Sequence, residues 1–237
     1  MSTLTIPARF RGPDGSGNGG WVAGAAAGFV PDGAGRPVEV TLRLPPPLDR
    51  PLPVRTAPGG IEVLDDAHDR DEPAVVVEAR VVGTPVPALE PVAFADARAA
   101  ENGYRGRKEH PFPECFACGP HRAEGDGLRI FPGPVAGRPE GHVAATWRPG
   151  ADVDVATVWA ALDCPGGWAG GFDATRPMVL GRITAVVDAV PAPGEQLVVA
   201  GALLGREGRR TTTASTLRRA DGSIVGRALH TWITLRT

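Results

Sequence analysis

The sequence lacks the features that would place the chain in a membrane or outside the cell. No run of about 18 apolar residues occurs, so we expect no transmembrane helix. The first residues, MSTLTIPARFRGPDG, have no apolar core of the kind that signal peptides carry. Cysteine is scarce and odd in number, with three residues, which argues against the disulfide framework of a secreted domain. These absences predict a cytoplasmic protein.

An excess of charge of one sign is also lacking. The 25 Lys and Arg residues nearly balance the 27 Asp and Glu residues, which leaves a net charge of −2 at pH 7. A nucleic-acid groove or a polybasic membrane surface needs a clear basic excess. We therefore expect neither a nucleic acid nor a membrane as a partner.

Glycine and proline, by contrast, are abundant, with 32 and 25 residues. Such a content approaches that of disordered chains. However, 42% of the residues are hydrophobic and 22% are charged, as in ordinary globular proteins, and several hydrophobic runs separate the glycines and prolines. We interpret these residues as turns between strands.

Alternating apolar and polar residues predict many strands. The clearest helical pattern is residues 153–163, in which Val155, Val158, Trp159 and Leu162 recur at helical spacing after an aspartate that would cap the helix. Residues 90–103 are a second helical candidate. An Asp-Gly turn at 221–222 lies between two alternating runs and predicts a hairpin. Strands are predicted within residues 4–11, 37–54, 60–66, 74–82, 128–131, 141–149, 178–190, 195–204, 209–219 and 223–235.

Three pairs of similar segments indicate an internal duplication. Gly-Gly-Trp occurs at 19–21 and again at 166–168, an offset of 147. Pro45 and Pro47 match Pro191 and Pro193 at an offset of 146, and residues 74–82 fall near residues 223–233 at about the same offset. We expect two units, each with a strand, a central helix and several antiparallel strands, at residues 1–83 and 113–237. Residues 84–112 would connect them.

The Gly-Gly pairs are expected to begin the central helices. Glycine would let a helix pack closely against its neighbours, which offsets its helix cost of about 1 kcal/mol. The free amides of a helix start would also be available to hold a developing oxyanion, which makes Gly20 and Gly167 candidates. Close packing alone is the alternative. Pro165 precedes the second pair where the first half has Asn18, so the two sites are not expected to be equivalent.

These segments resemble a double hotdog protein of the acyl-CoA thioesterase II-like group. GNGGWVAGAAA is similar to the start of that family's first hotdog helix, VWAALDCPG to its helix segment with an aspartate, and residues 209–235 to its closing hairpin. The resemblance covers most of the chain. It implies an α+β, tandem hotdog fold in which two antiparallel sheets each wrap around a central helix, and it implies thioesterase activity.

The resemblance also implies site residues. The family's aspartate falls on Asp163. The position of its glutamine falls on His230, which is a departure from the family pattern. The family's threonine falls near Leu180, with Thr184 as the nearest hydroxyl.

The surroundings of Asp163 and His230 leave alternatives open. Asp163 ends an apolar helical run, where a carboxylate is costly to bury unless it is paired. It would be a general base or a nucleophile, or instead a helix-terminal cap. His230 shares a strand face with Ala228 and Trp232, and because both faces are largely apolar we expect a central strand. His230 is then either a satisfied core histidine or a group that orients water.

Cys115 and Cys118, flanked by His110 and His121, form a Cys-x-x-Cys sequence. Two such cysteines are half of a zinc site, and the histidines or another chain would have to supply the rest. A redox pair and a reduced structural loop are the alternatives. Cys164 is a candidate nucleophile or simply a buried thiol.

We therefore expect an acyl-CoA thioesterase-like hydrolase that uses Asp163 and no cofactor. Its partner would be acyl-CoA or an acyl-carrier thioester, and the candidates for substrate binding are Trp159, Trp168, Thr184 and Arg210. The arginine would meet phosphates of coenzyme A or simply be a solvated strand end. A non-catalytic acyl-binding protein is the main alternative. A dehydratase of the same fold would need a histidine on the central helix, and neither helix has one. Copies of the chain could also associate through their sheets into a homo-oligomer.

Overall fold

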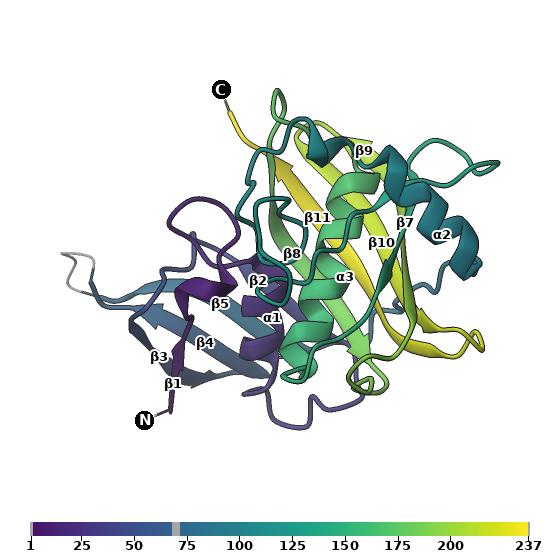
Figure 1. Cartoon of the computed structure of the whole chain (residues 1–237). Helices are drawn as coiled ribbons and strands as arrows, with labels where there is room; N and C mark the ends of the chain where they lie inside the picture. Colours follow the sequence, from purple (N-terminus) through teal and green to yellow (C-terminus); the bar gives the residue numbers. More distant parts are fainter. Residues whose placement is uncertain (1, 68–71, 237) are drawn as a thin grey trace.

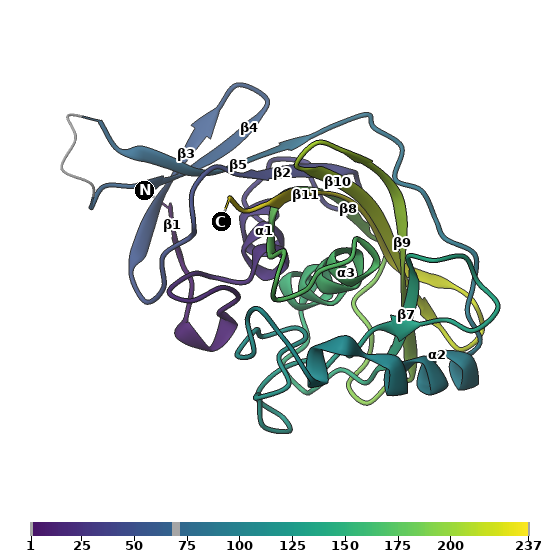
Figure 2. The same ribbon diagram turned by 90° about the horizontal axis from the view of Figure 1, so that it is seen from above.

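The computed structural model describes residues 2–67 and 72–236. One antiparallel sheet of eleven strands dominates the fold and curves around two helices (Figures 1 and 2). Its strand order is β1-β3-β4-β5-β2-β8-β11-β10-β9-β7-β6. The strands are β1 (Ser2–Thr5), β2 (Val38–Leu42), β3 (Pro51–Ala57), β4 (Gly60–Asp65), β5 (Ala74–Val81), β6 (Gly133–Pro134), β7 (His142–Trp147), β8 (Met178–Val187), β9 (Leu197–Glu207), β10 (Arg210–Arg219) and β11 (Ile224–Thr234).

Two of the helices lie side by side against the concave face of the sheet. These are α1 (Gly19–Ala27) and α3 (Val155–Ala169), and the sheet arcs over both in Figure 2. The third helix, α2 (Phe94–Ala100), lies outside this pair and packs on β7. Strand β11 shows how the sheet faces them, because Ala228, His230 and Trp232 are buried while the residues between them are half-buried. The hydrophobic core therefore lies between the sheet and the two helices.

The two halves of the sheet repeat one arrangement. The order β2-β5-β4-β3-β1 in the first half matches β8-β11-β10-β9-β7 in the second half, which agrees with the expected duplication. The expectation of two separate sheets is wrong, because β2 pairs with β8 from Val38↔Ala185 to Thr41↔Arg182. Each half would otherwise end in an unpaired strand edge, and pairing the two edges satisfies their backbone groups.

The two Gly-Gly-Trp sequences do not occupy equivalent places. The first begins α1, where the side chain of Asn18 accepts a hydrogen bond from the amide of Trp21 at 2.9 Å. The second lies near the end of α3, because this helix continues past Asp163 and through Pro165. The prediction that Gly167 begins a helix is therefore wrong. The proline pairs, in contrast, precede the equivalent strands β3 and β9.

Glycines of α1 allow it to touch the backbone of α3. A Cβ atom on Gly20 would lie 2.7 Å from the carbonyl oxygen of Trp159 and 3.0 Å from the Cα atom of Ala160. A Cβ atom on Gly24 would lie 2.7 Å from the Cα atom of Ala156. The contact therefore runs antiparallel along the two helices, and no larger residue fits at these positions without moving one of them.

Most other sequence predictions agree with the fold. The helix predicted within residues 90–103 is α2, and the Asp-Gly turn joins β10 to β11. Residues 128–131 were predicted as a strand and form none. Of the first predicted strand, residues 4–11, only residues 4 and 5 lie in β1, and a short 3-10 helix follows at residues 8–10. No helix within residues 2–67 and 72–236 is long and apolar enough to cross a membrane.

Candidate functional site

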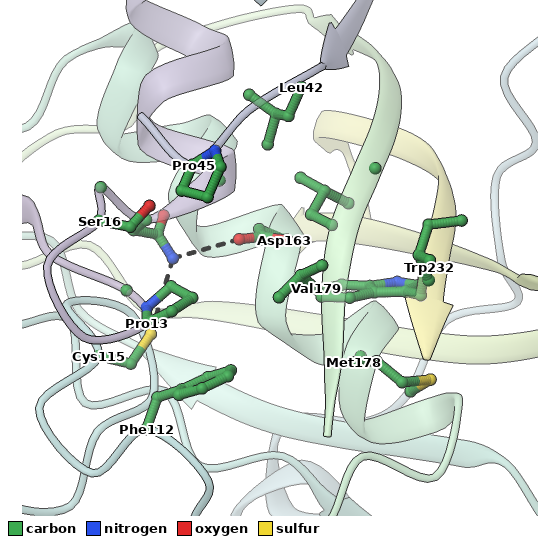
Figure 3. Close-up of a pocket in the computed structure, with 18 of the residues that line it drawn as sticks. Pro13, Ser16, Leu42, Pro45, Phe112, Cys115, Asp163, Met178, Val179 and Trp232 are labelled. Atoms are coloured by element: carbon green, nitrogen blue, oxygen red, sulfur yellow. Dashed lines mark hydrogen bonds between the residues drawn. The ribbon is translucent and has the colours of Figure 1, made fainter. Parts of the chain in front are cut away.

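A largely apolar cavity of about 390 Å³ lies beside the first turn of α1. Its walls come from the loop before α1, the residues after β2, the loop at residues 112–118, the middle of α3, and the ends of β8 and β11. Figure 3 shows several of the lining side chains: Leu42, Phe112, Met178, Val179 and Trp232. Segments that are far apart in the sequence therefore enclose one pocket.

Asp163 is the acid of this cavity. It lies in the middle of α3 and is 2% exposed. Its Oδ2 atom accepts hydrogen bonds from the amide of Gly20 at 2.9 Å and from Nδ2 of Asn18 at 3.2 Å (Figure 3). Its Oδ1 atom has no hydrogen-bond partner among the described residues. The carboxylate thus lies at the N-terminus of α1, where unpaired amides and the helix dipole favour a negative charge.

The environment of Asp163 shifts its protonation. Burial raises the pKa of the carboxyl group to about 7, and negative charge on Cys115 contributes in the same direction. The amide of Gly20 and the side chain of Asn18 oppose this rise because they donate to the ionised form. A carboxyl group with a pKa near neutrality can take up and release a proton at physiological pH, as a general base must.

Three buried thiols border the same cavity. Cys115, Cys118 and Cys164 are unpaired, and their Sγ atoms all lie within 4.8 Å of one another. Hydrogen bonds from the other two thiols lower the pKa of Cys115. Nε2 of His110 lies 3.3 Å from Sγ of Cys118, whereas the side chain of His121 is 65% exposed and faces Glu114. His121 flanks the Cys-x-x-Cys sequence but therefore does not contact the three thiols.

The structure does not bring His230 to Asp163. His230 is 1% exposed and does not line the cavity. Its Nδ1 atom lies 3.2 Å from both the hydroxyl and the carbonyl oxygen of Thr213, and its ring packs under Gly166 of α3. Burial lowers the pKa of His230 to about 4, so the ring is neutral at pH 7. Its Nε2 atom is buried without a hydrogen-bond partner among the described residues, so the ring is satisfied only at Nδ1. Its place away from the cavity favours the core histidine of the two alternatives.

The two glycine candidates differ in their surroundings. The amide of Gly20 is engaged by Asp163 and is not available to a ligand. Gly167 lines the cavity, but it lies late in α3, so the argument from a helix start does not apply to it. Gly19, which was not predicted, is the first residue of α1 and also lines the cavity.

The predicted substrate-binding residues lie outside the cavity. Trp159 packs between the helices against Gly24, and Trp168 joins a ring cluster with Tyr104 and His110. Thr184 is buried in β8.

Arg210 lies elsewhere, in a hollow of about 620 Å³ that it shares with Arg43, Arg182 and Arg206. Leu42, Arg43, Gly181 and Ile233 line both the hollow and the cavity, so the two adjoin. Arg210 therefore lines a hollow that adjoins the cavity.

Several lining residues escaped the sequence analysis, above all Asn18, Phe112 and Trp232. Asn18 carried a usable signal, because an asparagine directly before a helix is a favoured N-cap. Phe112 lies in a loop, and nothing local indicates what it faces.

Comparison with solved structures shows that the chain has a hotdog fold. A conserved protein of unknown function with a hot dog fold from Alicyclobacillus acidocaldarius is 12% identical, with a TM-score of 0.57 over 99% of this chain and 93% of that one. A tesB protein from Mycobacterium avium subs paratuberculosis is 14% identical, with a TM-score of 0.57 over 98% and 91%. A protein from Novosphingobium aromaticivorans, provisionally assigned as a thioesterase, is 14% identical, with a TM-score of 0.61 over 99% and 95%.

Sequence comparison gives no match at the family level. No protein-family model matches the chain, and no curated protein matches it. The solved structures, in contrast, confirm the predicted resemblance to hotdog proteins of the thioesterase II-like group at the level of the fold.

Proposed function

We propose that the chain consists of two fused hotdog units and hydrolyses an acyl thioester such as acyl-CoA, with Asp163 as the general base. The observation that carries this proposal is the state of Asp163. Its carboxyl group is buried on the wall of an apolar cavity, has a pKa of about 7 and leaves one oxygen without a partner among the described residues. A purely structural carboxylate would be expected to have both oxygens satisfied.

The two carboxylate oxygens of Asp163 would have different roles. The amide of Gly20 and the side chain of Asn18 hold Oδ2, so Oδ1 would take a proton from water. The water oxygen then bonds to the thioester carbon. As the tetrahedral intermediate collapses, the carbon–sulfur bond breaks and the proton passes from Asp163 to the departing thiolate. The acyl group would lie against the apolar wall formed by Leu42, Leu180 and Trp232.

The oxyanion would be held by the first turn of α1. The amide of Gly19 occupies the first helical position, which has no intrahelical acceptor, and Gly19 lines the cavity. One preorganised amide of this kind contributes about 3 to 4 kcal/mol in other hydrolases. The helix dipole favours the same developing charge.

The phosphates of coenzyme A would occupy the neighbouring hollow. Arg43, Arg182, Arg206 and Arg210 line it, and guanidinium groups bind phosphate through paired hydrogen bonds. Arg43 also forms an ion pair with Glu78 and Arg182 one with Glu39, whereas Arg210 forms no ion pair with a described residue. Arg210 would therefore be free to bind a phosphate of coenzyme A.

Replacing Asp163 with asparagine tests the proposal. Asn keeps the shape and can still accept from the amide of Gly20, but it cannot take a proton from water. We expect thiol release from a panel of acyl-CoA substrates to fall about 10²- to 10⁴-fold, while the circular dichroism spectrum is unchanged. Asp152→Asn is the matched control, because the side chain of Asp152 is 83% exposed. Unchanged turnover in Asp163→Asn would remove this residue from the mechanism.

The position of His230 favours a second candidate, a non-catalytic acyl-binding protein. The polar partner expected for Asp163 lies outside the cavity, so the proposed base works without a histidine beside it. Wild-type protein that binds acyl-CoA in calorimetry but releases no thiol would support this candidate and exclude hydrolysis.

A further inference from the structure

We propose that Cys115, Cys118 and Cys164 bind a zinc ion. These are all the cysteines of the chain, and they come from two distant segments, the loop at residues 112–118 and the middle of α3. Their Sγ atoms lie within 4.8 Å of one another, and those of Cys115 and Cys164 are 3.8 Å apart. Zinc–sulfur bonds of about 2.3 Å in a tetrahedron place sulfurs about 3.8 Å apart. Cys115 and Cys164 therefore already have the spacing of zinc ligands, and the sulfur of Cys118 lies within 4.8 Å of both.

The backbone holds the Cys-x-x-Cys loop in place. The amide of Phe116 donates to the carbonyl oxygen of Arg11 at 2.8 Å, and the amides of Leu128 and Ile130 donate to the carbonyl oxygens of Phe116 and Ala117. The hydroxyl of Tyr104 donates to the carbonyl oxygen of Cys118 at 2.7 Å. An irregular loop with this many fixed backbone groups presents its two cysteines rigidly, as a metal site requires.

Hydrogen-bond donors surround the sulfurs. The Nδ1 atom of His110 accepts from the amide of Phe112 at 2.9 Å, so the proton of the neutral ring is on Nε2, 3.3 Å from Sγ of Cys118. Nδ2 of Asn18 lies 3.6 Å from Sγ of Cys115 (Figure 3). His110 is thus a donor to a ligand and not a ligand itself. Such donors in the second coordination shell of a metal orient its ligands and tune its affinity.

A disulfide explains the cluster less well. A sulfur–sulfur bond is about 2.05 Å long, and joining two of the three sulfurs would leave the third buried beside it. Zinc sites with three protein ligands keep a fourth position for an exchangeable ligand, and three cysteines are one of the known ligand sets. All three cysteines line the cavity, so the fourth position would face it and take water or a ligand thiol. This inference does not depend on thioester hydrolysis.

Metal analysis of the full-length protein tests the site directly. We expect about one zinc per chain after purification. Replacement by Co²⁺ should give thiolate-to-cobalt charge transfer and the strong visible bands of a tetrahedral site. In the folded wild-type protein, a chelator should raise the number of thiols that react with a colorimetric reagent. Protein that contains no zinc and takes up no Co²⁺ would overturn the proposal, as would a disulfide between Cys115 and Cys164 in mass spectrometry.

Variants then assign the ligands. Cys164→Ser should lose zinc, and zinc retained at wild-type affinity in this variant would overturn the three-cysteine site. His110→Gln should weaken zinc binding about 10- to 100-fold, as removal of a second-shell partner does elsewhere. His121→Ala is the matched control and should bind zinc like the wild type, because its side chain faces solvent and Glu114. Zinc lost from His121→Ala would show that the ligand set is wrong.

Discussion

Replacing Gly20 with alanine would test the close contact between α1 and α3 that positions Asp163. The added Cβ atom would collide with the side chain of Asp163. It would also lie 2.7 Å from the carbonyl oxygen of Trp159 and 3.0 Å from the Cα atom of Ala160. The last two are backbone atoms, which cannot rotate away. The helices must therefore separate, and the hydrogen bond from the Gly20 amide to Asp163 must lengthen.

The expected loss of stability follows from three contributions. Alanine in place of glycine favours the helix by about 1 kcal/mol. Overpacking a close contact costs about 1 to 3 kcal/mol. Weakening a buried hydrogen bond to a carboxylate costs about 1.5 kcal/mol or more. We therefore expect the free energy of unfolding to fall by about 2 to 3 kcal/mol, which corresponds to a melting temperature about 5 to 10 °C lower for a chain of this size.

Gly28→Ala provides the matched control at the other end of the same helix. Gly28 has φ −62° and ψ −18°, and the carbonyl oxygen of Ala25, 3.3 Å away, is the one atom within 4 Å of the added Cβ. The added Cβ atom requires a shift of only a few tenths of an ångström there, so the free energy of unfolding should change by less than about 1 kcal/mol. Urea unfolding of both variants and the wild type at one pH measures the difference. Equal midpoints for Gly20→Ala and Gly28→Ala would refute the close contact.

Two further predictions concern His230 and Asn18. The pKa of His230 is about 4 in the folded chain and about 6.5 when unfolded, so the two states differ in bound protons between these values. This difference alone makes the free energy of unfolding fall as the pH drops from 6.5 to 4, by up to about 3 kcal/mol, whereas the raised pKa of Asp163, about 7, acts in the opposite direction over the same range. His230→Gln removes the histidine contribution, so its stability relative to the wild type should rise as the pH falls in urea unfolding; a difference that does not change with pH would contradict the buried neutral ring. Asn18 both caps α1 and donates to Asp163. Asn18→Ser should keep the helix cap, whereas Asn18→Ala should lower the free energy of unfolding by about 1 kcal/mol. Thiol release should fall in both variants, because both lose the amide that donates to Asp163. Full turnover in Asn18→Ser would show that this donor is dispensable.

The strands were predictable because their signals are local. Alternation and the Asp-Gly turn identified β10 and β11 without any knowledge of the rest of the fold. The start of α3 was equally local, since Asp154 caps it through a hydrogen bond from the amide of Thr157 at 2.7 Å. The pairing of β2 with β8 was not predictable, because nothing in either strand says which partner it will meet.

The end of α3 was missed because packing overrides helix propensity there. Pro165 and two glycines normally end a helix. In this chain the glycines let the helix lie against the sheet, since Cβ atoms on Gly166 and Gly167 would lie 2.7 Å from His230 and 3.1 Å from Trp232. The two Gly-Gly-Trp sequences thus have different structural roles, since the first begins α1 and the second lies near the end of α3. The second one therefore offers no free amides of a helix start.

The site was only partly predictable, because its residues meet through packing between distant segments of the sequence. Strand parity correctly grouped His230 with Ala228 and Trp232, but cover on both faces of the strand was expected, and the residues between them are only half-buried. Parity also does not indicate which residue of the buried face reaches the cavity. Trp232, two residues further, reaches the cavity, and His230 does not. Asn18 meets Asp163 across 145 residues of sequence, and no local pattern reports such a contact.

The difference between the two helix N-termini explains why only that of α1 receives a carboxylate from the other helix. In the first half, the N-terminus of α1 receives the carboxylate of Asp163 from the helix beside it. In the second half, the N-terminus of α3 is capped by its own Asp154, and α1, with the sequence GGWVAGAAA, has no carboxylate to offer in return. The glycines of α1 and the acid of α3 therefore depend on each other, because a carboxylate can approach the amide of Gly20 this closely only where α1 has no side chain. The two halves repeat one strand order, but the residues at their helix N-termini differ, and the proposed hydrolytic site is built from both halves.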